Sequence, residues 1–258
     1  MSKKLAIITG ATAGIGLAFA RKLAETHNLV LVARNKQRLS EIADELQTEV
    51  QVLAADLAEA KSLAGVEEFI LQQADIELLV NNAGFGTVGE FAELALEEEA
   101  TQVQLNVLAL TRLAHCGVQA MVKTGGGAII NVSSLAAFQP APYSAVYGAT
   151  KAYVKSFSQS LNAELKDSGI KVQALCPGLT HTEFHERAQI NTSNVPDFMW
   201  QSAEDVVKES LEGLKKNQAV VVPGLHNAAT AAISSLLPGN LTASWAAAVM
   251  KQTLAKDK

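Results

Sequence analysis

The chain has 258 residues, of which 48% are hydrophobic and 18% charged. This length suits a single α/β domain over residues 1–258 with a substantial core. Acidic residues outnumber basic ones by 26 to 21, so the formal net charge is −5. Without a basic excess to neutralise phosphates, nucleic acid is a poor candidate partner. Cys116 and Cys176 form no CxxC motif or Cys/His cluster, so we predict neither a disulfide framework nor a metal site.

The first residues indicate a strand rather than a leader sequence. Two lysines precede a short apolar run that ends at Gly10, whereas a signal peptide needs a longer apolar stretch and a small-residue cleavage site. The most apolar later region, residues 228–237, is about half the length of a membrane span. We therefore expect a cytoplasmic protein without a membrane span.

Short β-rich runs alternate with helical patterns along the chain. The runs are almost continuously apolar, as is typical of parallel strands that are covered on both faces. We predict strands at residues 5–9, 29–33, 50–54, 78–81, 128–132, 172–175 and 219–222. We predict helices at residues 15–26, 36–46, 58–73, 97–122, 145–167 and 203–215. This alternation predicts an α/β fold of the Rossmann-like type, a doubly wound parallel seven-stranded sheet with helices on both faces.

Two later segments depart from this alternation. Residues 179–201 show no clear period, and their length makes them a candidate lid over a site. Residues 227–258 indicate a helical tail of two short helices, separated by Pro238 and Gly239.

A glycine-rich turn follows the first predicted strand, where open α/β sheets bind ligands. Gly10, Gly14 and Gly16 lead into a helix. Glycines there allow a tight turn and close approach to a pyrophosphate, and the helix N-terminus supplies free N–H groups. The spacing is GxxxGxG rather than GxGxxG, so the motif by itself also fits a purely structural turn.

The residues after the next two strands bear on the choice of cofactor. Ala33 stands where NAD sites carry an acid, about 20 residues past the glycines, and Arg34 follows it. A guanidinium can grip a 2′-phosphate through two hydrogen bonds, so we expect NADP(H) to be preferred over NAD(H). The alternative is that Arg34 is an ordinary solvated residue at a helix start. Asp56, after the third strand, either caps the following helix or binds the adenine amino group.

Side chains suited to proton transfer follow the fifth predicted strand. Ser134 stands at its end, and Tyr147 and Lys151 share one face of the next helix because they are spaced i,i+4. A tyrosine has a reference pKa of about 10, which a nearby ammonium and an oxidised nicotinamide would lower toward the working range. A serine hydroxyl can hold a carbonyl oxygen while the tyrosine delivers its proton. A Tyr-x-x-x-Lys pair alone, however, is more often an ordinary exposed helix pair.

Taken in order, TGATAGIG, NNAG at 81–84, Asn106, Ser134, YGATK and Pro177-Gly178 resemble the short-chain dehydrogenase/reductase family. The resemblance covers residues 4 to about 182 and points to the shorter, single-domain branch. It implies a catalytic tetrad in which Tyr147 donates the proton and Ser134 polarises the carbonyl. In that scheme Lys151 holds the nicotinamide ribose and lowers the pKa of Tyr147, while Asn106 keeps a water that links Lys151 to solvent.

The resemblance also implies which residues hold the cofactor. The glycine loop would hold the pyrophosphate, Asp56 and Leu57 would lie near the adenine, and Pro177 and Gly178 would face the nicotinamide. One departure is Ala13, where many relatives carry a second basic residue, and this weakens the expected NADP preference. The expected cofactor-binding residues are Gly10, Thr12, Ala13, Gly14, Ile15, Gly16, Arg34, Asp56, Leu57, Asn82, Ala83, Gly84, Tyr147, Lys151, Pro177, Gly178 and Thr182.

These residues predict an NADPH-dependent carbonyl reductase or alcohol dehydrogenase. The alternative is a non-catalytic NADP(H)-binding redox-sensing module, which would have no need for Ser134, Tyr147 and Lys151 together. Aromatic and proline residues gather in the segments around the expected site, which favours an apolar or bulky ketone, keto-ester or 3-ketoacyl substrate. An equally weighted alternative is that half of them cover the lid's own small core. These residues are Phe85, Phe91, Phe138, Pro140, Pro142, Tyr143, Phe184, Phe198, Met199 and Trp200.

The resemblance further implies a homodimer or homotetramer. The apolar residues of the tail could cover a neighbouring subunit, complete the pocket or touch a membrane surface. An interfacial helix usually carries a strongly basic polar face. The tail lacks one, which favours subunit or pocket contact.

Overall fold

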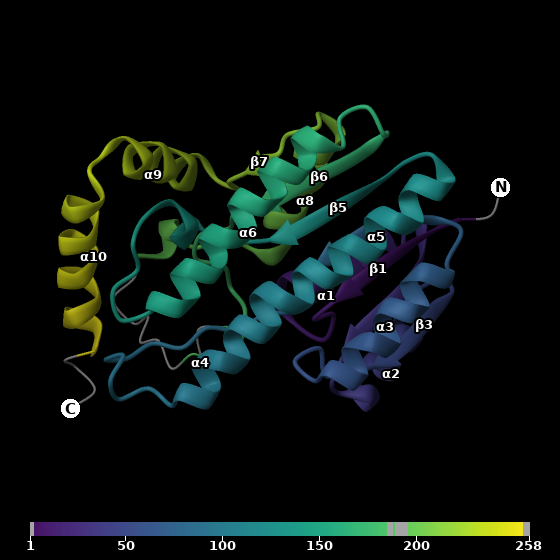
Figure 1. Cartoon of the computed structure of the whole chain (residues 1–258), viewed down its shortest axis with the longest axis horizontal. Coiled ribbons are helices and arrows are strands. Elements are labelled where there is room, and N and C mark those ends of the chain that lie inside the picture. The colour runs from purple at the N-terminus through teal and green to yellow at the C-terminus, as the bar shows by residue number, and fades with distance from the viewer. Residues whose placement is uncertain (1–2, 185–187, 189–195, 255–258) are drawn as a thin grey trace.

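The computed structural model describes residues 3–184, 188 and 196–254 (Figure 1). Its seven strands form one parallel sheet in the order β3-β2-β1-β4-β5-β6-β7. They are β1 (Lys4–Thr9), β2 (His27–Ala33), β3 (Val50–Ala54), β4 (Ile76–Asn81), β5 (Gly127–Val132), β6 (Ile170–Leu175) and β7 (Val220–Val221). The chain winds outward in one direction from β1 and in the other from β4, so a topological switch point lies between these two strands. The predicted fold class is confirmed.

Helices cover both faces of the sheet. One face carries α1 (Gly14–Leu23), α2 (Lys36–Glu45) and α8 (Ala203–Lys215). The other carries α3 (Ala60–Gln72), α5 (Leu110–Thr124) and α6 (Ala145–Glu164). The remaining elements are α4 (Leu96–Val103), the π-helical η1 (Gln104–Ala109), the 3₁₀ helices η2 (Leu135–Phe138) and η3 (Asp197–Met199), α9 (Leu225–Leu236) and α10 (Gly239–Leu254).

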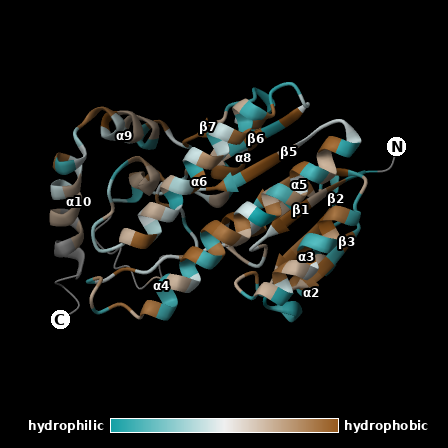
Figure 2. Cartoon of the chain, in the orientation of Figure 1, coloured by the Kyte–Doolittle hydropathy of each residue, from teal (hydrophilic) through white to brown (hydrophobic). Residues whose placement is uncertain are grey.

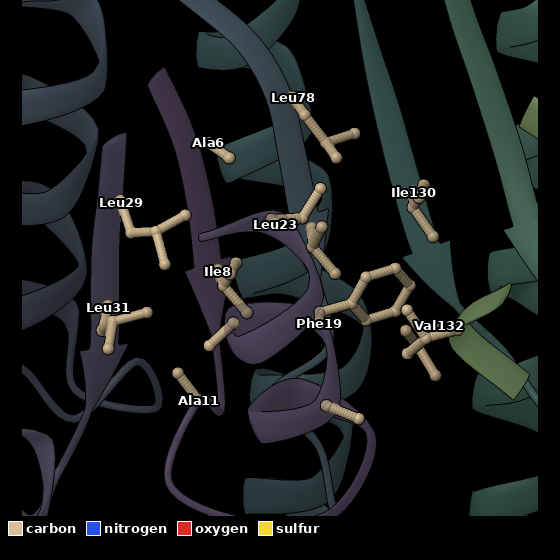
Figure 3. Packing of buried hydrophobic residues seen from close by; sticks show 14 of the residues in the cluster. Ala6, Ile8, Ala11, Phe19, Leu23, Leu29, Leu31, Leu78, Ile130 and Val132 are labelled. Carbon is tan, nitrogen blue, oxygen red and sulfur yellow. The ribbon is translucent and has the colours of Figure 1, made fainter. Parts of the chain in front are cut away.

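The core explains why the strands have such apolar sequences. Phe19 and Leu23, one turn apart on α1, belong to one buried cluster with Ile8 of β1 and with Leu29 and Leu31 of β2. The Phe19 ring points toward Val132 at the end of β5 (Figure 3). A second buried cluster lies on the opposite face of the sheet, and Figure 2 shows the strands largely brown between helices of mixed colour. Burying one large apolar side chain contributes about 1.5–3 kcal/mol. The packed helices therefore exclude water from both faces of the sheet. A ligand can bind only where the strands end.

The helices differ from expectation in a few places. The predicted helix at 15–26 ends at Leu23, since β2 already begins at His27. The predicted helix at 97–122 extends over 96–124 and contains the unpredicted π-helical segment η1. The tail contains two helices, with α10 starting directly after Pro238. Of the predicted lid, residues 185–187 and 189–195 lie outside the described residues, as do residues 255–258 of the tail.

Among the residues that the structure describes, one helical stretch is long and apolar enough to cross a membrane by length and composition. It is Leu96–Thr124, and 50% of its most apolar window is buried inside the protein. Its α5 portion packs on β4 and α3. A buried helix that covers a parallel sheet is expected to be this apolar.

Candidate active site

The carboxyl ends of the strands bring the predicted site residues to one edge of the sheet. The glycine loop follows β1, Arg34 follows β2, Asn82 follows β4, Ser134 lies just beyond β5 and Pro177 just beyond β6. These five strands are hydrogen-bonded neighbours in the sheet, in the order β2-β1-β4-β5-β6. This edge contains the switch point, where open sheets bind their ligands.

The glycine loop is too tight for other residue types. Gly10 and Gly14 adopt left-handed φ angles of +66° and +53°, which favour glycine. A Cβ on Gly16 would lie 2.3 Å from the carbonyl oxygen of Gly10. Asn82 holds this turn in place, since its Nδ2 donates to the carbonyl oxygens of Thr9 and Gly10 at 3.0 and 3.1 Å.

The start of α1 suits an anionic ligand. Its N-cap residue, Ala13, offers no side chain to the free backbone N–H groups, and the first turn carries no acidic residue. Uncapped N–H groups and the helix dipole together favour a phosphate. Thr12 lies within the same turn, and the partly buried Ile15 packs against the core. The loop therefore fits the pyrophosphate of a dinucleotide.

Thr9 organises this loop from below, a role that the sequence did not reveal. Its buried Oγ1 accepts hydrogen bonds from the backbone N–H groups of Asn82 and Ala83 at 2.9 and 3.0 Å. The hydroxyl donates in turn to the carbonyl oxygen of Val80 at 3.3 Å. The ends of β1 and β4 are thus joined through one threonine side chain, the first residue of the TGxxxGIG motif.

The three residues predicted to bind the adenosine end of the cofactor, Arg34, Asp56 and Leu57, have distinct surroundings. The Arg34 side chain is 77% exposed, and its Nη1 lies 4.0 Å from Asp56 Oδ2. Asp56 Oδ1 accepts from the N–H of Ala58 at 2.9 Å, within a turn that precedes α3 rather than at its N-cap, Glu59. The Leu57 side chain is buried in the core. Only the main-chain groups of Leu57 are thus left for a cofactor, whereas Arg34 is free to reach one.

Asn106 is clamped to the loop that follows β4. It lies in the π-helical segment η1 and is fully buried. Its Nδ2 donates to the Phe85 carbonyl oxygen at 2.8 Å and to Thr150 Oγ1 at 3.2 Å, and its Oδ1 accepts from the Phe85 N–H at 3.2 Å. A Cβ on Gly84 would lie 2.8 Å from this Oδ1 and 3.5 Å from Lys151 Nζ. Both amide hydrogens are used, so only one lone pair of Oδ1 is left for a water.

Ser134, Tyr147 and Lys151 meet where β5 ends. Lys151 is buried, and its Nζ donates to the carbonyl oxygen of Val132 at 2.9 Å and lies 5.6 Å from the centre of the Tyr147 ring. Ser134 Oγ accepts from the N–H of Ala136 at 3.1 Å, which orients the hydroxyl. Ser133, not predicted from the sequence, donates from Oγ to the carbonyl oxygen of Lys151 at 2.7 Å. The three predicted side chains are therefore fixed around one point at the sheet edge.

Burial shifts the pKa values of this group in opposite directions. It raises the pKa of Tyr147 to about 12, because desolvation penalises the phenolate more than the hydrogen bond with Ser134 favours it. It lowers the pKa of Lys151 to about 8. Burial within the protein therefore raises the tyrosine pKa that neighbouring positive charges were expected to lower. At neutral pH Tyr147 is protonated and can donate, while Lys151 is mostly charged.

Residues of the predicted lid contact both halves of the site. A Cβ on Gly14 would lie 2.8 Å from Thr182 Cγ2, so Thr182 sits directly over the glycine loop. The ring of Phe184 lies 5.6 Å, centre to centre, from that of Tyr147. The Tyr147 ring also packs against Gly86, where a Cβ would lie 2.8 Å from Tyr147 Cδ2 and 3.2 Å from Phe184 Cζ. Tyr147 therefore packs against both Phe184 and Gly86, which are in contact with each other.

The predicted apolar residues do not form one continuous pocket. A groove of about 480 Å³ is lined by Glu90, Phe91, Ala92, Pro142, Tyr143 and Ala247 of α10. Ser134 and Tyr147 are not part of its lining. Trp200 stacks on His181 at 4.8 Å, Phe138 lies beneath the ammonium of Lys155, and Phe198 is 75% exposed. The structure thus divides these residues between a groove beside the site and local packing.

Tyr143 has an unusual backbone conformation. Its φ of +62° is left-handed, which is strained for a bulky residue. Two hydrogen bonds hold it there, from the N–H of Gly89 to the Tyr143 carbonyl oxygen at 2.8 Å and from Ser144 Oγ to the Thr87 carbonyl oxygen at 2.7 Å.

Within residues 3–184, 188 and 196–254, no group of three or more His, Cys, Asp or Glu side chains is placed to hold a metal ion.

Comparison with known proteins agrees with this geometry. A family model described as short chain dehydrogenase matches residues 4–192. An uncharacterized oxidoreductase of Staphylococcus epidermidis is 33% identical over 76% of this chain and 89% of its own length. Sulfoacetaldehyde reductase 2 of Chromohalobacter salexigens is 36% identical over 70% of this chain and 74% of its own.

Two solved structures are similar across nearly the whole chain. A short-chain dehydrogenase from Sphingobium yanoikuyae, in complex with NADPH, has 37% identity and a TM-score of 0.81, covering 91% of this chain and 96% of that one. The bulky-bulky ketone specific alcohol dehydrogenase from Comamonas testosteroni has 34% identity and a TM-score of 0.77, covering 92% and 96%.

Proposed function

The chain belongs to the short-chain dehydrogenase/reductase family of oxidoreductases, and from that premise we propose that it is an NADPH-dependent carbonyl reductase. The reaction is reversible hydride transfer between the nicotinamide and a ketone or secondary alcohol. The proposal rests on the meeting of Ser134, Tyr147 and Lys151 at the end of β5. This group lies on the same sheet edge as a glycine loop that fits a pyrophosphate.

The roles of the side chains follow from their contacts and protonation. The bound cofactor supplies the hydride that reduces the carbonyl carbon. The Ser134 hydroxyl donates a hydrogen bond to the carbonyl oxygen, and Tyr147 Oη transfers its proton to that oxygen as negative charge develops there. Burial keeps the phenol protonated at neutral pH, so Tyr147 is in the form that reduction requires.

Lys151 and Asn106 support this step. The Lys151 ammonium, anchored on the Val132 carbonyl oxygen, stabilises the phenolate that Tyr147 becomes and holds the nicotinamide ribose. Reprotonation of Tyr147 runs from solvent through Lys151, with Asn106 Oδ1 accepting from a water on that path. Asn82, Gly178 and Thr182, with their neighbours at the same ends of the strands, would make the remaining cofactor contacts.

We propose NADP(H) over NAD(H) because Arg34 follows β2 directly and Ala33 leaves the acid position empty. The exposed guanidinium can form two hydrogen bonds to a 2′-phosphate. The NADPH complex of the similar Sphingobium yanoikuyae protein supports this choice.

The proposed substrate is an apolar or bulky ketone. The mostly apolar groove beside the site offers room for one arm of such a molecule. The similar Comamonas testosteroni enzyme is named for ketones that are bulky on both sides. A keto-ester or 3-ketoacyl compound would fit the same lining.

We further propose a single-domain, cytoplasmic homo-oligomer, either dimer or tetramer. Three apolar or aromatic side chains, Leu108, Val122 and Tyr153, lie on the outer faces of the η1–α5 helix and of α6. These residues are 40–55% exposed. Apolar residues on adjacent long helices are typical of a subunit interface. Light scattering of the purified protein measures its mass directly, and a monomer would contradict this part of the proposal.

The experiment that tests the proposed function is cofactor oxidation by the purified protein, with NADPH and NADH in parallel. The ketone panel runs from small aliphatic through aryl ketones to keto-esters and 3-ketoacyl substrates. We expect turnover that favours NADPH and the bulkier ketones. Tight NADPH binding without turnover of any ketone would instead favour the non-catalytic redox-sensing module.

A further inference from the structure

A buried amide outside the predicted site joins three segments beside it. Asn227, at the start of α9, is 4% exposed. Its Nδ2 donates to Gln201 Oε1 at 2.9 Å and to the Pro223 carbonyl oxygen at 2.8 Å. The amide also lies against Gly178, where a Cβ would approach its Oδ1 to 2.4 Å and its Nδ2 to 2.5 Å. Figure 1 shows α9 leaving β7 across the end of the sheet.

Gln201, at the end of the predicted lid, pairs through its backbone with residues 179–181 at the start of the lid. Its N–H donates to the Leu179 carbonyl oxygen at 3.0 Å, and its carbonyl oxygen accepts from the N–H of His181 at 3.0 Å. Thr180 and Gln201 thus form a parallel bridge. We call residues 179–181 and 200–201 the neck. Because Thr182 follows directly, the position of the neck determines how Thr182 meets the glycine loop.

Gln201 is bonded to the turn before α9 in both orientations of its amide, but through different partners. In one, Gln201 Oε1 accepts from Asn227 Nδ2. In the other, its amide nitrogen donates to the Pro223 carbonyl oxygen at 3.0 Å and its oxygen accepts from the Gly224 N–H at 3.2 Å, while Asn227 Nδ2 only contacts the Gln201 amide nitrogen, at 2.9 Å. Gly224, with φ +82°, is also held by Glu209, whose Oε2 accepts from the Gly224 N–H at 3.0 Å. The turn that carries Asn227 is therefore firmly tied to α8 as well as to the neck.

The loop after β6 is supported from the other side by the catalytic segment. The Pro177 carbonyl oxygen accepts from the N–H of Leu135, the residue after Ser134, at 2.8 Å. Thr180 Oγ1 donates to the Gly178 carbonyl oxygen at 3.1 Å. Gly178 is thus packed between Asn227 and the segments that line the proposed nicotinamide side of the site.

We infer that Asn227 is a positioning residue, which sets the Gly178 loop and the neck against the cofactor site through its contacts with Gly178 and Gln201. The inference rests on the proposed function, since it assigns these segments to nicotinamide binding. An apolar side chain could fill the same space, but it could not bond Gln201 and Pro223. Leaving the buried Pro223 carbonyl oxygen and the half-buried Gln201 amide without these bonds is costly, so the neck should shift when the Asn227 amide is lost.

The test compares Asn227→Leu with Asn162→Leu. Asn162, on α6, also donates from Nδ2 to two oxygens, of Val172 and Asn217, at 2.9 and 3.0 Å, and it lies outside the site. We expect Asn227→Leu to raise the NADPH Kd and KM about tenfold with a smaller change in kcat. Asn162→Leu should lower the melting temperature but leave these constants unchanged. Equal NADPH constants for Asn227→Leu and the wild type would overturn the inference.

Gln201→Leu and the double variant test the route of the effect. Coupled residues give non-additive changes, so the double variant should bind NADPH about as weakly as either single variant. Additive losses would contradict the coupling through Gln201.

Amide hydrogen exchange tests the inference without any cofactor. The backbone amides of His181 and Gln201 should exchange faster in Asn227→Leu than in the wild type. Their exchange rates should not change in Asn162→Leu. Unchanged exchange in Asn227→Leu would refute the positioning role. If the wild type bound no nicotinamide cofactor, the proposed function would fail, whereas the exchange result would still decide whether Asn227 holds the neck.

Discussion

Replacing Arg34 with alanine should weaken NADPH binding without affecting NADH. The Arg34 guanidinium is 77% exposed, and its contact with Asp56 at 4.0 Å is a solvent-exposed ion pair worth less than about 1 kcal/mol. Little free energy is therefore lost when the Arg34 side chain leaves Asp56 to bind a phosphate. A hydrogen bond to a charged group contributes about 1.5–3 kcal/mol, and exposure favours the lower end. Because 1.4 kcal/mol is about tenfold in affinity, we expect the NADPH Kd of Arg34→Ala to rise about tenfold.

Arg38→Ala is the matched control for this prediction. Arg38 lies four residues later, on α2, and its Nη1 is already paired with Glu41 at 3.1 Å. Fluorescence titration of wild type and both variants with NADPH and NADH, at two salt concentrations, measures the effect. The difference between wild type and Arg34→Ala should shrink at high salt, since exposed charges are screened. The reasoning would be refuted if Arg34→Ala weakened NADH equally, or if Arg38→Ala weakened NADPH as much.

Three further perturbations test the catalytic geometry. Burial lowers the pKa of Lys151 to about 8, so kcat/KM for NADPH in steady-state assays should fall above pH 8 as the ammonium is lost, and a flat profile to pH 10 would contradict this. Gly86→Ala places a Cβ 2.8 Å from Cδ2 of Tyr147 and should lower kcat by about 10–100-fold. Gly65→Ala, whose Cβ would meet nothing within 4 Å, should leave kcat unchanged and stabilise α3 by up to about 1 kcal/mol; equal kcat in the two glycine variants would sink the packing argument. Tyr143→Gly removes one wall of the groove and should raise KM for ketones with two bulky arms but not for methyl ketones, and an unchanged KM ratio would exclude the groove from substrate binding.

The fold could be predicted from the sequence because its signals are local. Strands buried on both faces must be apolar throughout, so runs such as β1 and β5 stand out against the amphipathic helices between them. Glycine spacing and the i,i+4 relation of Tyr147 and Lys151 are equally local. Right-handed parallel connections then account for helices on both faces of the sheet.

What could not be predicted depends on contacts between distant residues. Thr9 acts on Asn82, and Asn227 acts on Gln201, only after the strands have aligned. The π-helical segment around Asn106 changes the backbone hydrogen bonds without changing the side-chain pattern.

The tyrosine pKa shows the same limit. The sequence contains the charge that would lower the pKa of Tyr147, but not the burial that raises it to about 12. Burial is decided by Gly86 and Phe184, which come from different loops. A motif therefore identifies the acid, whereas the packing around it sets its protonation state.

The central claim is that Tyr147 donates the proton in a carbonyl reduction. The most direct measurement is NADPH oxidation by wild type and Tyr147→Phe with a bulky ketone, together with the NADPH Kd of each. We expect the variant to bind NADPH like the wild type and to lose turnover. Turnover retained in Tyr147→Phe would contradict this claim.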